Sequence, residues 1–273
     1  MSFIRKIKVI PFFLFFLALA STNGCSSKDA AEKELIKSKL SLDKTHVAEI
    51  EYKNGNTKPL PKVVEEDKKA NHNYGYRNGD KYLQQYQQSN RIHQLILVEQ
   101  SKDVASTGTL FLLIKKNTDD WREVLRCKAY LGKNGINKTQ EGDVRTPTGD
   151  FGMIMAFGAK DDPGSLIPYT KLTNTMYLCG DKEYYNQFID VSKIKHTCSN
   201  NSEHLIRYVP QYNYALIFDY NKENVYGKGS AIFLHCFGSY PFTMGCISVA
   251  EENMVKILKT VDTNARICIY PYE

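Results

Sequence analysis

Short runs of apolar and β-branched residues alternate with turn-forming residues from Arg91 to the C-terminus. Runs of roughly four to eight such residues are typical of strands that are buried on one or both faces. The predicted strands cover residues 95–98, 109–114, 123–130, 151–157, 214–220, 230–235 and 266–270. The pattern therefore predicts a mostly β domain that folds as a β-sandwich or as a barrel-like sheet.

Helical spacing of apolar residues is clear in one place. Met254, Ile257, Leu258 and Val261 form a stripe at helical spacing, and Ser248 followed three residues later by a glutamate resembles a capping box. We therefore predict a helix that begins at Ser248. A weaker helical pattern covers residues 184–191.

Residues 158–213 form a long segment with little regular pattern. A connection of this length inside a domain usually serves as a functional lid or a substrate wall. Its tyrosines, at positions 169, 177, 184 and 185, either line a peptide site or pack the insertion onto the domain.

The N-terminus has the pattern of an export signal. Arg5, Lys6 and Lys8 precede an apolar run that is too short for a membrane-spanning helix, so residues 1–24 are predicted to be a signal peptide. Two processing sites compete: an Ala-x-Ala site at 18–20, and a lipoprotein-like box that would make Cys25 the lipidated first residue of the mature chain. Both predict an exported protein of the cell envelope, and the second predicts a membrane anchor.

Residues 25–90 are rich in Lys, Glu, Asn and Gln and contain little that forms a core, so we interpret them as a polar tether. Tyrosines at 74, 76, 82 and 86 either stay solvated with this tether or pack onto the domain. The folded domain is then expected to cover residues 91–273. We expect it to be a monomer.

Charge and cysteine content narrow the possible partners. The formal charge is +6, and the predicted signal peptide contains three of the positive residues, which leaves +3. Since basic and aromatic residues are not interleaved, no nucleic-acid partner is expected. Among the seven cysteines, Cys179 and Cys198 lie in the irregular middle segment and form either a disulfide or two free thiols. No Cys-x-x-Cys or His-Glu-x-x-His pattern is present, so neither a metal nor another cofactor is predicted.

Residues 230–248 contain the strongest candidate chemistry. His235 ends an apolar strand, and Cys246 follows eleven residues later, after Gly245 and before the predicted helix. A cysteine nucleophile needs an adjacent imidazole to take its proton, and a helix N-terminus favours the thiolate. We therefore expect an ionised Cys246 beside His235. Gly245 would let backbone N–H groups approach a substrate carbonyl as an oxyanion hole.

Two motifs in this chain resemble the active-site signature of the L,D-transpeptidase (YkuD-like) catalytic domain. Residues 243–248 (Thr-Met-Gly-Cys-Ile-Ser) are similar to its Ser/Thr-His-Gly-Cys motif, and residues 142–151 (Gly-Asp-Val-Arg-Thr-Pro-Thr-Gly-Asp-Phe) to its Thr-Pro-Thr-Gly-x-Phe stretch. The resemblance runs from about Arg91 to the C-terminus. Met244 replaces the second histidine of the motif and the spacer from His235 is short, as in one branch of the family.

The resemblance implies acyl transfer on peptidoglycan stem tetrapeptides, with Cys246 as the nucleophile and His235 as the base. The backbone N–H groups of Met244, Gly245 and Cys246 would bind the oxyanion, and the carbonyl of Cys236 would fix the tautomer of His235. Substrate-binding roles would fall to three further residues, namely Arg145, Thr146 and Thr243.

Two alternatives remain open from the sequence. One is a hydrolase of wall peptides, such as an L,D-carboxypeptidase, in which water replaces the acceptor amine. The other is a non-catalytic, wall-binding lipoprotein.

Overall fold

The structure of the chain is a computed structural model that describes residues 79–116 and 120–272. The predicted signal peptide, Cys25 and the part of the tether before residue 79 lie outside the described residues. Within the described ranges, no helix is long and apolar enough to cross a membrane.

Nine strands of the described residues form one sheet in the order β12-β1-β2-β3-β11-β10-β9-β4-β5. Their bounds are β1 (Gln94–Gln100), β2 (Thr107–Lys116), β3 (Asp120–Tyr130), β4 (Gly149–Gly158), β5 (Tyr169–Lys171), β9 (Ala215–Phe218), β10 (Phe233–Cys236), β11 (Ile247–Val249) and β12 (Arg266–Tyr270). Because β12 also pairs with β4, eight strands close into a barrel, and β5 pairs with β4 outside the ring. The prediction of a mostly β, barrel-like domain is confirmed.

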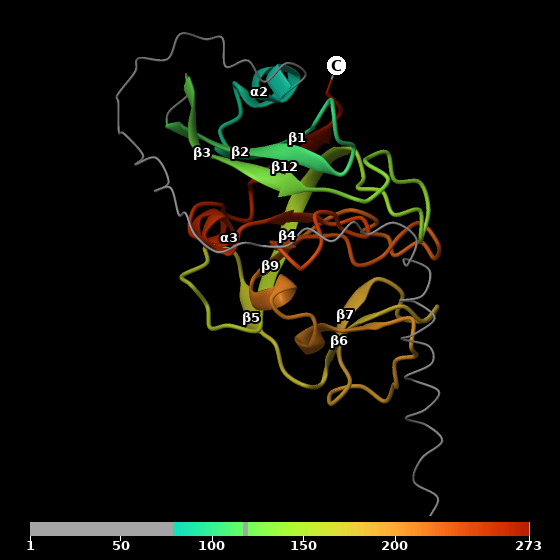
Figure 1. The fold of residues 1–273 in the computed structure, drawn as a ribbon. Helices are drawn as coiled ribbons and strands as arrows, with labels where there is room; N and C mark the ends of the chain where they lie inside the picture. Colours follow the sequence, from blue (N-terminus) through green and yellow to red (C-terminus); the bar gives the residue numbers. More distant parts are fainter. Residues whose placement is uncertain (1–78, 117–119, 273) are drawn as a thin grey trace, which may run out of the picture. The chain divides into compact units, whose positions relative to one another are not determined.

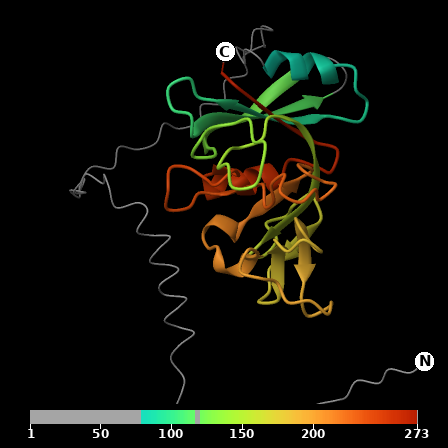
Figure 2. The same cartoon turned by 90° about the vertical axis from the view of Figure 1, so that its right-hand side faces the viewer.

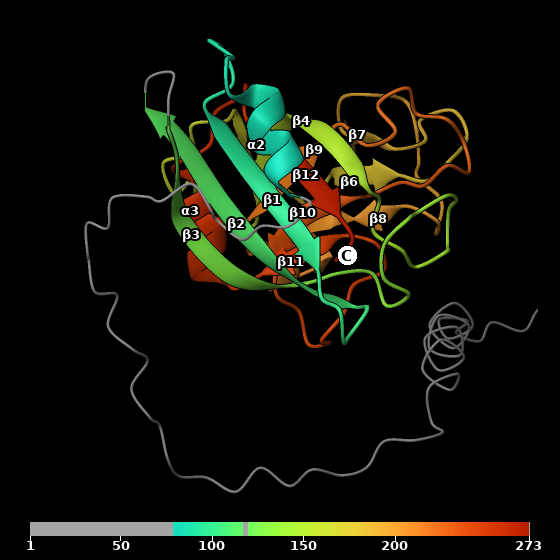
Figure 3. The same ribbon diagram turned by 90° about the horizontal axis from the view of Figure 1, so that it is seen from above.

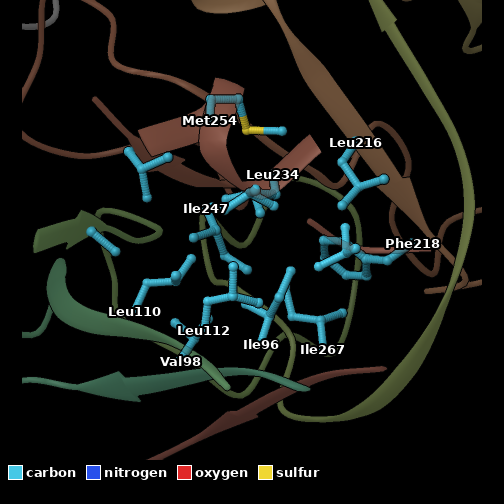
Figure 4. Packing of buried hydrophobic residues seen from close by; sticks show 14 of the residues in the cluster. Ile96, Val98, Leu110, Leu112, Leu216, Phe218, Leu234, Ile247, Met254 and Ile267 are labelled. Carbon is cyan, nitrogen blue, oxygen red and sulfur yellow. The ribbon is translucent and has the colours of Figure 1, made fainter. Parts of the chain in front are cut away.

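Strand β1 shows why continuous apolar runs form this barrel. Ile96 and Val98 join the interior cluster, whereas Leu95 and Leu97 belong to a second cluster on the outer face. Alternate side chains of a strand point to opposite faces, so a strand covered on both sides is apolar throughout. Figure 4 shows the interior packing, which includes Leu110, Leu112, Leu216, Phe218, Leu234, Ile247, Met254 and Ile267.

Helix α2 (Asp80–Tyr86) covers the outer face of β1, β2 and β12 (Figures 1 and 3). Tyr82 and Leu83 are buried there, and the ammonium group of Lys115 donates hydrogen bonds of 2.6–2.9 Å to three carbonyls at and beyond the C-terminal end of the helix. The packed part of the chain thus includes a segment that the sequence assigned to the tether. Two of its tyrosines, Tyr82 and Tyr86, pack onto the domain.

Helix α3 (Glu251–Leu258) is the predicted helix, but its start differs from the prediction. Ser248 lies inside β11, where it pairs with His235 of β10, and Ala250 is the N-cap with no side-chain cap hydrogen bond. The capping-box interpretation is therefore wrong. The parallel pairing of β10 with β11 places Ser248 in the sheet, and the helix begins only after that strand ends.

The insertion contains a sheet of its own, in the order β7-β6-β8, formed by β6 (Met176–Cys179), β7 (Gln187–Asp190) and β8 (Glu203–His204). It is followed by two short 3₁₀ turns, η2 (Leu205–Arg207) and η3 (Gln211–Asn213). The helix predicted over 184–191 is wrong, because Asn186 adopts a positive φ of 60° and turns the chain back along β6. Figures 1 and 2 show this sheet at the opposite end of the domain from α2.

Candidate active site

Strands β10 and β11 bring Cys246 and His235 to the same face of the sheet. Their parallel register pairs Leu234 with Ile247 and His235 with Ser248. Cys246 immediately precedes β11, and its Sγ accepts the backbone N–H of Phe233 at 3.3 Å. Phe233 and Cys246 pack in one cluster under the insertion, whereas Leu234 and Cys236 face the barrel interior. The side chain of Cys236 thus points away from His235, as the alternation along the strand predicts.

The Cys246 thiol is buried and protonated in this structure. Only 8% of the residue is exposed, and Sγ donates a hydrogen bond to the carbonyl of Ala231 at 3.0 Å. Burial, assisted by the negative charge of Glu203, raises the pKa of Cys246 to about 12, although the Phe233 N–H and the Lys138 charge act in the opposite direction. At neutral pH Cys246 is therefore a thiol.

The His235 imidazole is held as a neutral base. Its Nδ1 lies 2.7 Å from the carbonyl oxygen of Cys236, which assigns the proton to Nδ1 and leaves Nε2 as an acceptor. Burial lowers the pKa of His235 to about 4, even though the bond to Cys236 acts to raise it. The tautomer is thus set by the same carbonyl that the family resemblance implied.

This pair of neutral groups corrects the expectation of an ionised thiol at a helix N-terminus. Cys246 precedes a strand, and α3 begins at Glu251, so the end of that helix is separated from the thiol by β11. The dipole effect falls off within one turn of a helix. Burial disfavours the thiolate form of Cys246, so a nucleophilic role for this residue would require a base that takes its proton.

Thr146 and Thr243 hold the backbone of the nucleophile. Their hydroxyl groups donate to the carbonyl oxygen of Cys246 at 3.1 and 2.6 Å, respectively. Thr146 is fully buried, and its hydroxyl also accepts the N–H of Gly132 at 2.8 Å. The sequence placed both threonines in a substrate pocket, but in this structure their hydroxyls are directed at Cys246 itself.

The backbone N–H groups near the thiol are not equally available. The N–H of Gly245 donates to Oγ1 of Thr243 at 3.1 Å and is therefore already used within the protein. Met244, which is predicted to act through its backbone N–H, is 70% exposed. Of the three oxyanion donors that the sequence predicted, Met244 and Cys246 remain the candidates.

Arg145 is exposed, and its guanidinium donates to the carbonyl of Ile136 at 3.0 Å.

Two residues near Cys246 have a positive φ. Val144, which precedes Arg145, has a φ of +59°, and Ala231, which accepts the thiol hydrogen bond, has a φ of +55°. A positive φ is strained for residues with a Cβ, above all for a β-branched one, and such strain concentrates at functional sites. Two strained residues therefore lie in the segments that flank the Cys246 thiol and backbone.

Lys138 could not be identified from the sequence; its positive charge acts to lower the pKa of Cys246. Its side chain is only 2% exposed and forms an ion pair of 2.8 Å with Asp143. Although burial opposes it, the bond from Lys138 and three backbone N–H groups lower the pKa of Asp143 to about 2. A lysine between polar neighbours has no local pattern that distinguishes it from a surface lysine.

Glu203 was also missed, because its neighbourhood depends on how the insertion folds. The hydroxyl of Tyr212 donates to Glu203 Oε2 at 2.6 Å, and the edge of the same ring packs against His235 with centroids 5.5 Å apart. Burial, together with the charge of Glu141, raises the pKa of Glu203 to about 7 despite the Tyr212 bond. Tyr212 thus connects a carboxyl that titrates near neutrality with the predicted base.

Replacing Glu203 with glutamine is expected to remove a pH dependence of stability. The carboxyl pKa is raised from 4.5 to about 7 on folding, so its contribution is fully present below pH 4.5 and is lost as the pH rises through 7. At about 1.4 kcal/mol per pKa unit, the loss is about 3 kcal/mol. Urea denaturation at pH 5, 7 and 9 measures it.

The matched control is Glu223→Gln, which alters a side chain that is 61% exposed. This control should keep the slope of the parent protein. Parallel pH dependences for Glu203→Gln and the parent would contradict the prediction.

Comparisons with known proteins give distant structural similarities. No protein-family model matches the chain, and no curated protein matches it. Among solved structures, the chain is similar to L,D-transpeptidase 1 of Mycobacterium tuberculosis, with 14% identity and a TM-score of 0.29 over 64% of this chain and 62% of that chain. It is also similar to an L,D-transpeptidase of Xylanimonas cellulosilytica, with 15% identity and a TM-score of 0.30 over 67% of this chain and 62% of that chain.

The chain therefore spans about three fifths of the length of each of these solved chains. Both identities are too low to transfer an activity. An assignment of function depends on the geometry around Cys246.

Proposed function

We propose that the protein is a cysteine-dependent L,D-transpeptidase that acts on peptidoglycan stem tetrapeptides. The observation that carries the proposal is the contact between the two sequence motifs, since Thr146 of one donates to the carbonyl of Cys246 in the other across a separation of 100 residues. This contact orients a buried thiol on the face of the sheet that also carries His235, whose Nδ1 bond to Cys236 leaves Nε2 as the acceptor. A nucleophile, a base and an element that fixes the base are the components of covalent acyl transfer.

The first half-reaction begins when substrate displaces the thiol hydrogen bond to Ala231. Nε2 of His235 takes the Sγ proton while sulfur attacks the carbonyl carbon of the third stem residue. The N–H groups of Met244 and Cys246 stabilise the resulting oxyanion. The C–N bond to the terminal D-alanine then breaks, and the imidazolium returns the proton to the leaving amine.

The second half-reaction resolves the thioester. An amine on a neighbouring stem attacks the same carbonyl carbon, gives its proton to His235, and expels Cys246 sulfur, which is reprotonated. The product is a direct cross-link. The positive charge of Lys138 stabilises the anionic sulfur of Cys246, because this charge acts to lower the pKa of the thiol.

We further propose that the protein is exported to the cell envelope, is anchored there by a lipid on Cys25 and is a monomer. Two alternatives are distinguished by the fate of the acyl group. Release of a tripeptide acid indicates a carboxypeptidase, and absence of any thioester indicates a non-catalytic wall-binding protein.

The test is mass spectrometry of the intact protein after incubation with a stem tetrapeptide. We expect an acyl adduct on Cys246 together with free D-alanine, and neither product from Cys246→Ala. Cys127→Ala is the matched control, because Cys127 lies on β3 away from the site, and it should form the adduct at the rate of the parent. A folded parent protein that forms no adduct, or forms one on another cysteine, would refute the mechanism.

A further inference from the structure

A second cluster of reactive side chains lies in the insertion, apart from the candidate active site. Cys179 ends β6, and His196 and Cys198 lie in the segment between β7 and β8. One donor atom from each of these three residues lies within 4.8 Å of the other two. All of the described cysteines, including these two, are free thiols.

The distances agree with those of a zinc site before metal binding. Zn–S and Zn–N bonds of about 2.3 and 2.0–2.1 Å place the sulfur and nitrogen corners of a tetrahedron about 3.5 Å apart, and two sulfur corners about 3.8 Å apart. Sγ of Cys179 lies 3.4 Å from Nε2 of His196. Small side-chain rotations would bring all three donors to tetrahedral spacing.

The hydrogen bonding of His196 supports a cation at this place. Its Nε2 faces Cys179 Sγ and also lies 3.1 Å from Oδ2 of Asp181. One imidazole nitrogen has a single hydrogen or a single lone pair, so it serves only one of these neighbours well. A metal ion bound by the nitrogen and the sulfur would satisfy both, and the nearby carboxylate would favour its positive charge.

The surroundings of the cluster hold its ligands in position. The ring of Tyr184 packs on His196 with centroids 4.6 Å apart, and Asp181 accepts the N–H of Ser199 at 2.9 Å. Ser202 Oγ lies 3.7 Å from Cys179 Sγ, as a donor to a ligating sulfur would. Such outer contacts orient metal ligands and tune their affinity.

A metal site would help to stabilise the small sheet of the insertion. Its strands contain four, four and two residues, which is short for a unit that must hold its own shape. Small structural units without a large core are commonly stabilised by disulfides or a structural metal. Here the cluster would join the end of β6 to the segment that leads into β8.

We propose that Cys179, His196 and Cys198 bind one Zn²⁺ that stabilises the insertion, with a water molecule as the fourth ligand and the Asp181 carboxylate as a neighbouring group outside the ligand set. Binding releases the two thiol protons and forms two Zn–S bonds, one Zn–N bond and one Zn–O bond. The site orders the chain that leads into β8, and therefore the position of Glu203 beside Tyr212. The proposal does not depend on the activity of Cys246.

The experiment uses the full chain purified under reducing conditions and dialysed against Zn²⁺, with metal content measured by atomic emission. We expect one zinc per chain, and a thiolate-to-metal absorption band when Co²⁺ is added to the metal-free protein. Asp181→Asn should weaken Co²⁺ binding at least about tenfold. Cys179→Ser should abolish it, whereas the control Cys127→Ser should bind as the parent does.

Metal analysis of the parent protein keeps the proposal testable even when Cys179→Ser does not fold. A reduced, folded parent that binds neither Zn²⁺ nor Co²⁺ would overturn it. Metal binding that persists unchanged in folded Cys179→Ser would also overturn it, and so would a Cys179–Cys198 disulfide that forms in the presence of excess Zn²⁺.

Discussion

Thioester formation is expected to slow by about 10²–10⁴-fold when His235 is replaced with glutamine, the range that general-base catalysis usually contributes. The reason is the charge state of the resting nucleophile. The pKa of Cys246 is raised to about 12, chiefly by burial, so almost no thiolate exists at pH 7 without a base. Single-turnover mass spectrometry with a stem tetrapeptide measures the rate. His93→Gln is the control, since His93 lies just before β1 and its ring nitrogen bonds to the carbonyl of Asn90, far along the chain from Cys246.

The pH profile of the parent protein tests the same idea. Burial lowers the pKa of His235 to about 4, so the imidazole remains a base down to about pH 5. The rate of thioester formation is then expected to stay level between pH 6 and 8. A decline centred near the ordinary histidine pKa of about 6.5 would contradict a buried base, and so would a His235→Gln variant that keeps the parent rate.

The barrel could be predicted from the sequence because its strands are buried on two faces. Residues 95–98 are apolar at every position, and each side chain packs into the hydrophobic cluster on the face to which it points. Local composition therefore carries the information that defines such a strand. The small sheet of the insertion has no comparable pattern, since β8 consists of Glu203 and His204 and exists only because β6 pairs with it.

In the candidate site, too, some features could be predicted from local sequence and others depend on the tertiary fold. The short loop between His235 and Cys246 predicts that the two side chains meet, and the register of β10 and β11 places both residues on one face of the sheet. Their charge states were not predictable, since these depend on burial beneath the insertion and on the distant charges of Glu203 and Lys138. Ser248 shows how tertiary structure can override a local pattern: its sequence context resembles a helix cap, but the residue pairs with β10 as part of a strand.

Replacing Gly245 with alanine is expected to cost about 2–4 kcal/mol of unfolding free energy and to abolish thioester formation. Gly245 has a φ of +144°, a conformation that residues with a Cβ rarely adopt. An added Cβ would lie 2.9 Å from Ile232 Cδ1 and 3.0 Å from the backbone oxygen of Arg145. The isoleucine can rotate, but the Arg145 carbonyl belongs to the segment that Thr146 ties to Cys246, so relief of the clash would move the nucleophile.

Gly142→Ala separates the two causes of this loss. Gly142 also has a positive φ, +74°, but an added Cβ there would have nothing within 4 Å. It should therefore cost only the backbone strain, about 1 kcal/mol, and leave the rate of thioester formation unchanged. Urea denaturation and single-turnover kinetics on both variants provide the comparison. Equal costs for the two substitutions would show that the close approach of the Cys246 loop to Arg145 has no role in positioning the thiol.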